Sequence, residues 1–429
     1  MRQFNTLAGA ISSTASNPTI GDTIEITSTD GSAAVWAFRG TVGQTINQSP
    51  AQLGNALFND GSGNQWSAIS GSDGNVTPKT LGAKVDGVTD DSLAAAAFSN
   101  YCGSLASSSN GFTGLLNSGV MVLQGFNWPA FTSFKSEGKR SSVLKLKDNA
   151  TDHLMYPERW DQNINVASGR QSLKGLTLDG NKANQTGQYH NLIVYNYQTE
   201  IDIISKFSSG NGILFTDETR NLTLTTTNMS EVDFSHCRFE QNDLEGLKST
   251  NAANKIADGN ILNCVFNANG ASGDIPNISI DRFAGWKMTG NQLYGAGGDD
   301  TVLLNADRCV ITGNHFDLDG VNVVSGEIHA LKITNAGSEA VNISNNIFFL
   351  DGTLTGATIM NAIGLNGPTI SGYTLTGNNS SKRGGFAGNT YMLDNFNGSA
   401  LTVNAVSTGN NKGGLTAYTK GAFALTAGD

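Results

Sequence analysis

A short motif recurs at roughly even spacing over the second half of the chain, and this recurrence limits the possible folds more than any other feature. Five segments share the pattern of a turn followed by a short apolar strand: CRFEQN, CVFNAN, NQLYGAG, NHFDLDG and NIFFLDG. Their apolar positions, 27, 27, 23 and 32 residues apart, are Phe239, Phe266, Leu293, Phe316 and Phe348. A period of about 20 to 30 residues, with short strands and no intervening helix, is typical of a solenoid.

The solenoid that best fits this repeat is a parallel β-helix, so the expected fold class is all-β. Each coil would supply strands that pair with the next coil at a spacing of about 4.8 Å, and inward apolar residues would stack into one core. Asn residues at the turns suit tight corners, because their amides form local hydrogen bonds and can stack. We expect the β-helix to cover residues 143–382 in about ten coils. The alternative, a β-sandwich, would lack this common register.

The segments on either side of the repeat have different compositions. Residues 1–76 alternate short apolar runs with Gly, Asp and Asn, which predicts a small β-rich module. Residues 77–142 form a linker with the run SLAAAAFSNYC, which predicts a helix that Asp90 and Asp91 could cap. A lone helix before a long β region indicates a plug over the apolar end of the first coil. Residues 383–429 lose the clear repeat, so we expect a C-terminal cap or a trimerisation tail.

Charge and composition argue against several classes of function. Lys and Arg total 26 against 36 Asp and Glu, and the net charge of −10 argues against nucleic acid as a partner. No apolar run is long enough for membrane insertion, and the first 20 residues lack the apolar core of a secretory signal. The four cysteines are expected to be buried free thiols. Neither Cys nor His spacing indicates a metal or a cofactor.

The densest group of ionisable residues in the repeat region lies between residues 243 and 329. Taking Leu247, Ile280, Leu304 and Ile333 as equivalent strand positions places one column of residues on a common face: Asp243, Pro276, Asp300 and His329. Asp243 and Asp300 would then lie two coils apart, at about 9.6 Å, which approaches the spacing of an inverting glycosidase pair. We therefore predict Asp243 and Asp300 as catalytic acid and base. Glu245 and Asp281 are the further catalytic candidates.

The same region contains residue types that bind sugar chains. Lys248 and Arg282 could pair with anionic groups, and Trp286 could stack on a sugar ring. Glu327 and His329 complete the predicted substrate-binding set. Two alternatives stay open at this point. One is a lyase in which Lys248, Arg282 or His329 acts as the base, and the other is a solvated face whose Asp residues only cap turns.

The segment GAKVDGVTDDSLA resembles the signature GA-x-x-DG-x-TDD-x-x-A at the start of the pectate-lyase-like β-helix domain of many phage tailspikes. The matching residues are Gly82, Ala83, Asp86, Gly87, Thr89, Asp90, Asp91 and Ala94. The preceding LFNDGSGNQWSAI is similar to the short virion-anchoring segments of such spikes. The resemblance implies a right-handed parallel β-helix. It implies no particular chemistry, because lyases, hydrolases and pure binders share the fold.

The resemblance further implies a homotrimeric phage tailspike that recognises and depolymerises a host cell-surface polysaccharide, as a glycoside hydrolase. The N-terminal module would join the spike to other phage tail or adaptor proteins. The protein would be assembled in the host cytoplasm and released in the virion by lysis, which agrees with the lack of a secretory signal. A receptor-binding spike without enzymatic activity and a polysaccharide lyase are the alternatives.

Overall fold

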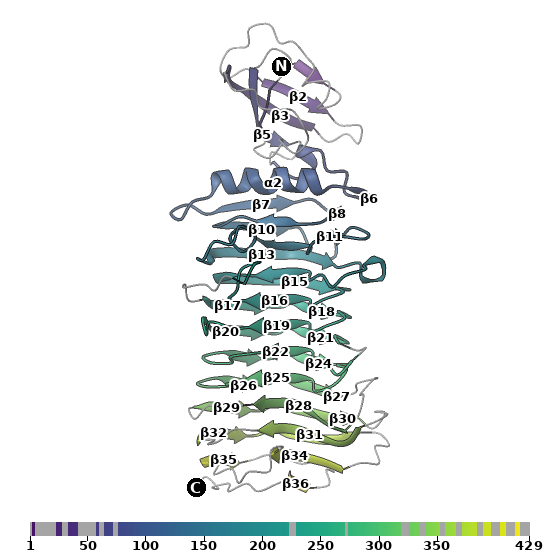
Figure 1. Cartoon of the computed structure of the whole chain (residues 1–429), viewed down its shortest axis with the longest axis vertical. Coiled ribbons are helices and arrows are strands. Elements are labelled where there is room, and N and C mark those ends of the chain that lie inside the picture. Colours follow the sequence, from purple (N-terminus) through teal and green to yellow (C-terminus); the bar gives the residue numbers. More distant parts are fainter. Residues whose placement is uncertain are drawn as a thin grey trace.

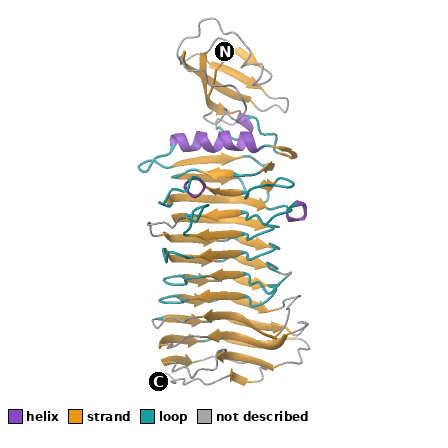
Figure 2. Ribbon diagram, in the orientation of Figure 1, coloured by secondary structure: helices purple, strands orange, loops and turns teal. Residues whose placement is uncertain are grey.

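The computed structural model contains a small N-terminal sheet and a long solenoid (Figures 1 and 2). The described residues are 2–4, 23–27, 33–41, 57–59, 64–71, 76–222, 229–270, 273–318, 326–334, 340–351, 357–365, 371–383, 389–395, 404–408 and 417–420. The N-terminal sheet has the strand order β1-β2-β3-β5-β4. Its strands are β1 (Arg2–Phe4), β2 (Thr23–Thr27), β3 (Ala33–Thr41), β4 (Leu57–Asn59) and β5 (Asn64–Gly71).

Two long sheets with parallel pairing form the solenoid, which confirms the prediction of an all-β, right-handed parallel β-helix. Sheet 2 is the eleven-stranded sheet, with one strand from each successive coil. Its strands are β9 (Phe126–Trp128), β12 (Met155–Pro157), β14 (Leu192–Val194), β16 (Ile213–Thr216), β19 (Leu247–Thr250), β22 (Ile278–Ile280), β25 (Thr301–Leu304), β28 (Gly326–Thr334), β31 (Ala357–Leu365), β34 (Asn389–Asn395) and β36 (Ala417–Lys420).

Sheet 1 is the twenty-stranded sheet and contains the other strands of the coils. Its strands are β6 (Asp86–Asp90), β7 (Phe112–Leu116), β8 (Gly119–Leu123), β10 (Thr132–Ser136), β11 (Ser142–Leu146), β13 (Ser168–Asp179), β15 (Asn196–Lys206), β17 (Met229–Ser235), β18 (Arg238–Glu240), β20 (Ile256–Leu262), β21 (Val265–Asn267), β23 (Lys287–Thr289), β24 (Gln292–Tyr294), β26 (Val310–Thr312), β27 (His315–Leu318), β29 (Val341–Ser344), β30 (Ile347–Asp351), β32 (Ser371–Thr376), β33 (Asn379–Arg383) and β35 (Asn404–Thr408).

The predicted apolar column is one continuous stack in the core. Phe239 pairs in register with Phe266, and the same column continues through Leu293, Phe316 and Phe348. The Phe239 and Phe266 rings stack with centroids 4.5 Å apart, and the Phe316 and Phe348 rings do so at 4.9 Å. All five side chains are fully buried. The sequence repeat therefore identified the core column residue by residue.

An asparagine ladder, formed by Asn291, Asn314, Asn346 and Asn378, supports one corner of the coils. Each side-chain amide donates to the Oδ1 of the next Asn, at 2.9, 3.0 and 3.0 Å. Each amide also donates to a backbone carbonyl in the interior. Because the corner buries these groups, the repeated amide supplies the hydrogen bonds that water would otherwise provide.

The predicted helix is α2 (Ser92–Leu105), which lies across the first coil (Figure 2). It buries Phe98 and Cys102 and packs on β7, β8 and β9, as expected of a plug. Asp90 accepts a hydrogen bond from the Ser92 N–H at 3.0 Å. Asp91 departs from the capping prediction, because its carboxylate accepts the N–H groups of the linker residues 84 and 85 instead.

The solenoid extends beyond the predicted range of 143–382 at both ends. Strands β7 to β11 already pair as coils, and β34, β35 and β36 continue the two ladders to Lys420. The remaining tail residues, with Phe386, Phe396 and Phe423, lie outside the described part of the chain. All four cysteines are buried free thiols, as predicted. Short helical turns are α3 (Glu158–Asp161), η2 (Lys79–Leu81) and η3 (Lys182–Asn184). No described helix has the length and apolar character to cross a bilayer.

Candidate functional site

The register of sheet 2 decides which side chains share a face, and it differs from the predicted alignment. The equivalent positions in successive coils are Leu247, Ile278, Thr301 and Leu331. Ile280 pairs with Ser249 rather than with Leu247, and Ile333 pairs with Leu303 rather than Leu304. Relative to Leu247, the predicted alignment is therefore displaced by two residues at Ile280, by three at Leu304 and by two at Ile333. The loops between coils differ in length, so sequence spacing alone does not set the register.

This register creates a band of ionisable side chains along sheet 2, which we call the polar stripe. Its members are Glu245, Lys248, Asp281, Asp299, Glu327, His329, Lys332 and Asp394. The column two residues before the equivalent positions contains Glu245, Asp299 and His329 in that order, with Pro276 between the first two. Figure 1 shows the strands concerned, from β19 to β34, stacked along the axis.

The predicted catalytic pair is not brought together. Asp300 is fully buried, and its carboxylate accepts a hydrogen bond from the Asn277 amide at 2.6 Å. Asp243 is 43% exposed and forms an ion pair with Lys182 at 2.9 Å. One carboxylate therefore faces the interior and the other faces solvent. The neighbouring residue Asp299, rather than Asp300, belongs to the polar stripe.

Two predicted substrate-binding residues occupy other environments. Trp286 is fully buried, and its ring stacks on those of Phe283 and Phe234 with centroids 5.8 and 6.4 Å apart. It is a core residue, which corrects its prediction as a sugar platform. Arg282 extends from the end of β22 and donates a hydrogen bond to the Asn254 carbonyl at 3.3 Å.

The centre of the polar stripe is formed by Glu245, Lys248 and Asp281. Lys248 Nζ lies 2.8 Å from Glu245 Oε1, and the Glu245 side chain is 7% exposed. Burial raises the pKa of Asp281, and the charges of Asp217 and Glu245 raise it further, whereas Lys248 and the Asn251 N–H oppose the shift. A half-buried carboxyl with a raised pKa, next to a second carboxylate, has the electrostatics of a general acid.

The next coils place a buried histidine between two carboxylates. His329 Nδ1 lies 3.0 Å from Asp299 Oδ1, and its Nε2 lies 3.0 Å from Asp394 Oδ2. Burial alone would lower the pKa of His329, but the hydrogen bonds to both carboxylates raise it. Burial would raise the pKa of Asp299, and the hydrogen bonds and charges of His329 and Lys332 lower it instead. Glu327 lies in the same group, where it accepts a hydrogen bond from the Asn361 amide at 2.5 Å.

A second group on sheet 2, nearer the plug helix, was not identified from the sequence; we call it the Arg220 cluster. Its members are Asp152, His153, Tyr156, Trp160, Asp161, His190 and Arg220. The Arg220 guanidinium lies over the Tyr156 and Trp160 rings, 4.8 and 4.7 Å from their centroids. It also pairs with Asp152 at 3.0 Å and with Asp161 at 2.8 Å. Arg220 is 68 residues from Asp152, so no local motif indicated the cluster.

The two histidines of the Arg220 cluster are neutral and accept backbone hydrogen bonds at Nδ1. Their rings stack with centroids 4.8 Å apart, and each Nδ1 accepts a backbone N–H, from His190 to His153 and from Asn211 to His190. A neutral ring that accepts at Nδ1 carries its proton on Nε2. Burial lowers the pKa of His153 to about 4 and that of His190 to about 3. The charges of His153 and Lys248 also lower the pKa of His190.

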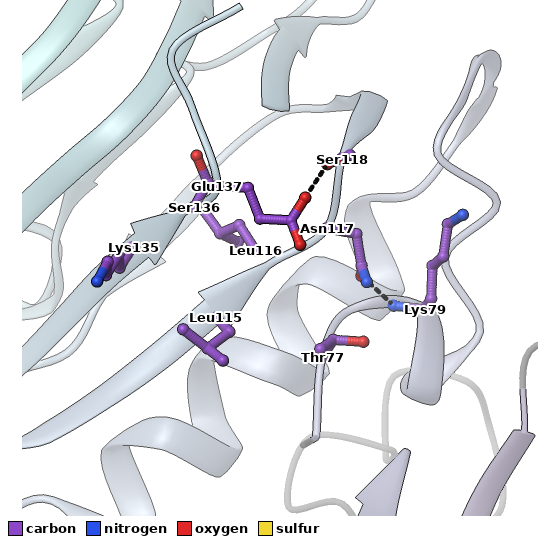
Figure 3. A pocket seen from close by; sticks show the side chains of 9 residues that line it. All are labelled: Thr77, Lys79, Leu115, Leu116, Asn117, Ser118, Lys135, Ser136 and Glu137. Carbon is purple, nitrogen blue, oxygen red and sulfur yellow. Dashed lines mark hydrogen bonds between the residues drawn. The ribbon is translucent and has the colours of Figure 1, made fainter. Parts of the chain in front are cut away.

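A cavity of about 640 Å³ lies where the linker meets the first coils (Figure 3). Its lining residues are Thr77, Lys79, Leu115, Leu116, Asn117, Ser118, Lys135, Ser136 and Glu137. Asn117 Oδ1 accepts the Lys79 N–H at 2.9 Å, and the Ser118 hydroxyl donates to Glu137 at 3.0 Å. The first bond attaches the segment before β6 to the turn after β7, and the second joins the turns that follow β7 and β10.

Comparison with known proteins supports the fold. No family model matches the chain. The pre-neck appendage protein of Bacillus phage phi29 is 37% identical over 109 residues, which are 25% of this chain. The corresponding protein of Bacillus phage PZA is 38% identical over 111 residues. The matched segment is only 11% of the length of each of these relatives.

Solved structures with the same architecture come from phage and bacterial proteins. The A-module of mannuronan C-5 epimerase AlgE4 from Azotobacter vinelandii superimposes with a TM-score of 0.60 at 16% identity, over 82% of this chain and 100% of that one. The enzymatically active domain of tailspike protein 2 from bacteriophage CBA120 gives 0.52 at 14% identity, over 100% and 56%. At such identities the likeness concerns the fold. The chain is a right-handed parallel β-helix protein, with the fold of phage tailspike and mannuronan epimerase domains.

Proposed function

We propose that this chain is a phage tailspike that binds a host cell-surface polysaccharide along the polar stripe and cleaves it by glycoside hydrolysis. The observation that carries the proposal is the group formed by Glu245, Lys248 and Asp281. The phage appendage relatives and the tailspike with the same fold support the assignment to a virion.

Hydrolysis of a glycosidic bond requires one protonated and one ionised carboxyl group on either side of the bond. We assign the proton donor to Asp281, because its raised pKa retains the proton at higher pH than an ordinary Asp would. We assign the base or nucleophile to Glu245, whose carboxylate Lys248 holds by an ion pair. These roles replace the predicted pair of Asp243 and Asp300.

The Arg220 cluster is the proposed sugar-binding part of the same face. Arg220 is 32% exposed, and His153 and His190 are half-buried. Cations and neutral N–H donors can bind an acidic or hydroxyl-rich sugar although the whole chain is acidic, because local fields decide binding. Arg220, aligned by two rings and two carboxylates, presents its charge in one orientation.

The test is incubation of the full chain with a panel of bacterial envelope polysaccharides. Reducing ends and absorbance in the unsaturated-uronate band are both followed. New reducing ends without absorbance support hydrolysis, and absorbance indicates a lyase. Binding without either product indicates a receptor-binding spike without enzymatic activity. If no polysaccharide of the panel is bound or cleaved, the proposal is overturned for these substrates.

Variants of the two assigned carboxyl groups test whether the cleavage activity lies on the polar stripe. Asp281→Asn and Glu245→Gln are each expected to lower the cleavage rate by about 100-fold or more. Glu200→Gln is the matched control, because Glu200 is an exposed carboxylate that pairs with Lys174 on the outward face of sheet 1. Full activity in both stripe variants would move the catalytic site elsewhere.

Assembly is a separate part of the proposal. We propose a homotrimer, attached through the N-terminal sheet to other phage tail or adaptor proteins and assembled in the host cytoplasm. Light scattering of the full chain measures the mass directly, and a mass near the 44.9 kDa of one chain would contradict the trimer.

A further inference from the structure

We propose that Glu327, His329, Asn361 and Asp394 bind a divalent transition-metal ion that joins the last coils of the solenoid. One ligand atom from each of Glu327, His329 and Asp394 lies within 4.8 Å of the others. His329 is 2% exposed and Asp394 is fully buried. The residues come from β28, β31 and β34, three neighbouring strands of sheet 2. This site lies in the same polar stripe as the proposed catalytic group but contains none of the residues Glu245, Lys248 and Asp281.

The orientation of His329 is the first argument. Asp299 Oδ1 accepts both the backbone N–H of His329, at 2.7 Å, and its Nδ1–H, at 3.0 Å. With the proton on Nδ1, the Nε2 lone pair points toward Asp394 Oδ2, 3.0 Å away. This contact therefore holds a cation, a proton in the metal-free chain, and we infer that a metal ion replaces that proton. A carboxylate on the far nitrogen of the ring is the usual arrangement behind a metal-bound histidine.

Asn361 supplies a second and independent observation. Its side chain is fully buried, and its amide nitrogen donates to Glu327, so the amide lies beside one of the three ligands. Its Oδ1 has no hydrogen-bond partner in the part of the chain that the structure describes. A buried amide oxygen without a donor costs about 1–3 kcal/mol in general, and metal coordination removes such a cost.

The backbone and the charges accommodate an ion. Gly364 lies on β31, between the strands that carry His329 and Asp394. A Cβ at this position would approach His329 Nε2 to 2.8 Å. The missing side chain lets the imidazole lie across β31 and reach Asp394. Asp299 is paired with Lys332 at 2.6 Å. Glu327 and Asp394 together carry a charge of −2, which a divalent ion would neutralise.

The donor set indicates the type of metal. One imidazole nitrogen with carboxylate and amide oxygens suits Mn²⁺ or Zn²⁺. Ca²⁺ and Mg²⁺ prefer oxygen ligands alone, so we expect them to bind more weakly. The bound ion would connect β28, β31 and β34 near the end of the aromatic column, where Ser380 follows Phe348 in register.

The test is a calorimetric titration of the full chain, stripped with a chelator, with Mn²⁺ and with Zn²⁺ separately. We expect one ion per chain and a rise in the unfolding temperature on binding. His329→Ala should abolish both effects, and Asp299→Asn should weaken binding by about 10- to 100-fold. Electron paramagnetic resonance of bound Mn²⁺ should report nitrogen coordination in the wild type.

Controls separate metal binding from loss of fold. Glu327→Gln changes a half-buried ligand at the edge of the group and should weaken binding while the circular dichroism spectrum stays unchanged. His236→Ala, which removes a histidine on sheet 1 outside the cluster, should bind like the wild type. Equal metal binding by the wild type and His329→Ala, or no binding by the wild type, would overturn the proposal. The cation between His329 and Asp394 would then be a proton.

Discussion

The asparagine ladder and the polar stripe both run along the axis of the solenoid, but they are built in opposite ways. The ladder repeats one residue type in successive coils, and every amide is satisfied by its neighbours. The stripe changes residue type in every coil, from Glu245 to Asp299 to His329. The same residue type recurs in the ladder because every coil has the same buried corner to stabilise. Variation indicates groups that serve a particular coil, as a binding or catalytic site does.

The largest effect is expected from breaking the ladder. Asn314→Leu removes the Oδ1 that accepts both the backbone N–H and the amide of Asn291, and it removes the amide that donates to Asn346 and to the Met288 carbonyl in the buried corner. Since each unsatisfied buried group costs about 1–3 kcal/mol, the free energy of unfolding should fall by about 3–5 kcal/mol. Urea denaturation followed by tryptophan fluorescence measures the loss. Asn379→Ala, at an exposed position one residue after the ladder, is the control and should change the free energy by less than about 0.5 kcal/mol.

The second effect is a dependence of stability on pH that comes from the Arg220 cluster. The pKa values of His153 and His190 are lowered to about 4 and about 3 in the folded chain, whereas an unfolded histidine has a pKa near about 6.5. Below that value the unfolded chain binds protons that the folded chain does not. Stability is therefore full above about pH 6.5 and falls as the pH drops toward 4, by about 1.4 kcal/mol per pH unit for each histidine.

Thermal unfolding of the wild type and His153→Gln between pH 7 and pH 4 tests this dependence. The difference in melting temperature between the two proteins should shrink as the pH falls, because the variant has lost one of the two groups that titrate. A parallel decline of the two proteins would contradict the assignment.

A smaller effect is expected when the charge of the Arg220 cluster is removed. Arg220→Met keeps a long apolar stem over Tyr156 and Trp160 but removes the cation that pairs with Asp152 and Asp161. The dissociation constant for a bound polysaccharide should rise about tenfold, as for the loss of one charge-assisted hydrogen bond. Surface plasmon resonance measures this change. Lys174→Met, on sheet 1, should leave the affinity as it is.

The smallest effect is expected at Asp300, a buried carboxylate next in sequence to Asp299 of the polar stripe. Asp300→Asn keeps a side-chain oxygen as the acceptor for the Asn277 amide in the interior, so cleavage and polysaccharide binding should stay within about twofold of the wild type. Asp299→Asn, one residue away, removes a charge that pairs with His329 and Lys332 on the stripe. The cleavage rates of the two variants are compared with that of the wild type. A large loss of cleavage in Asp300→Asn alone would restore the predicted catalytic role of Asp300.

The repeating architecture follows from the amino-acid sequence alone. The spacing of Phe239, Phe266, Leu293, Phe316 and Phe348 predicted the core column, and Asn at the turns predicted the ladder. These predictions succeeded because a coil must present the same kind of residue at the same point to join the stack. The plug helix followed for a similar reason, since the apolar end of the first coil needs a cover.

Which ionisable side chains meet depends on how the coils stack in three dimensions. Asp299 and Asp300 are adjacent in sequence, and the chain before β25 directs one carboxylate to His329 and the other to Asn277. A shift of one residue exchanges the two faces of a strand, and loops of unequal length hide such shifts in the sequence. Trp286 was likewise placed in the core by register alone. Arg220 and Asp152 meet across 68 residues, because the coils that carry them stack in space and have no local motif in common.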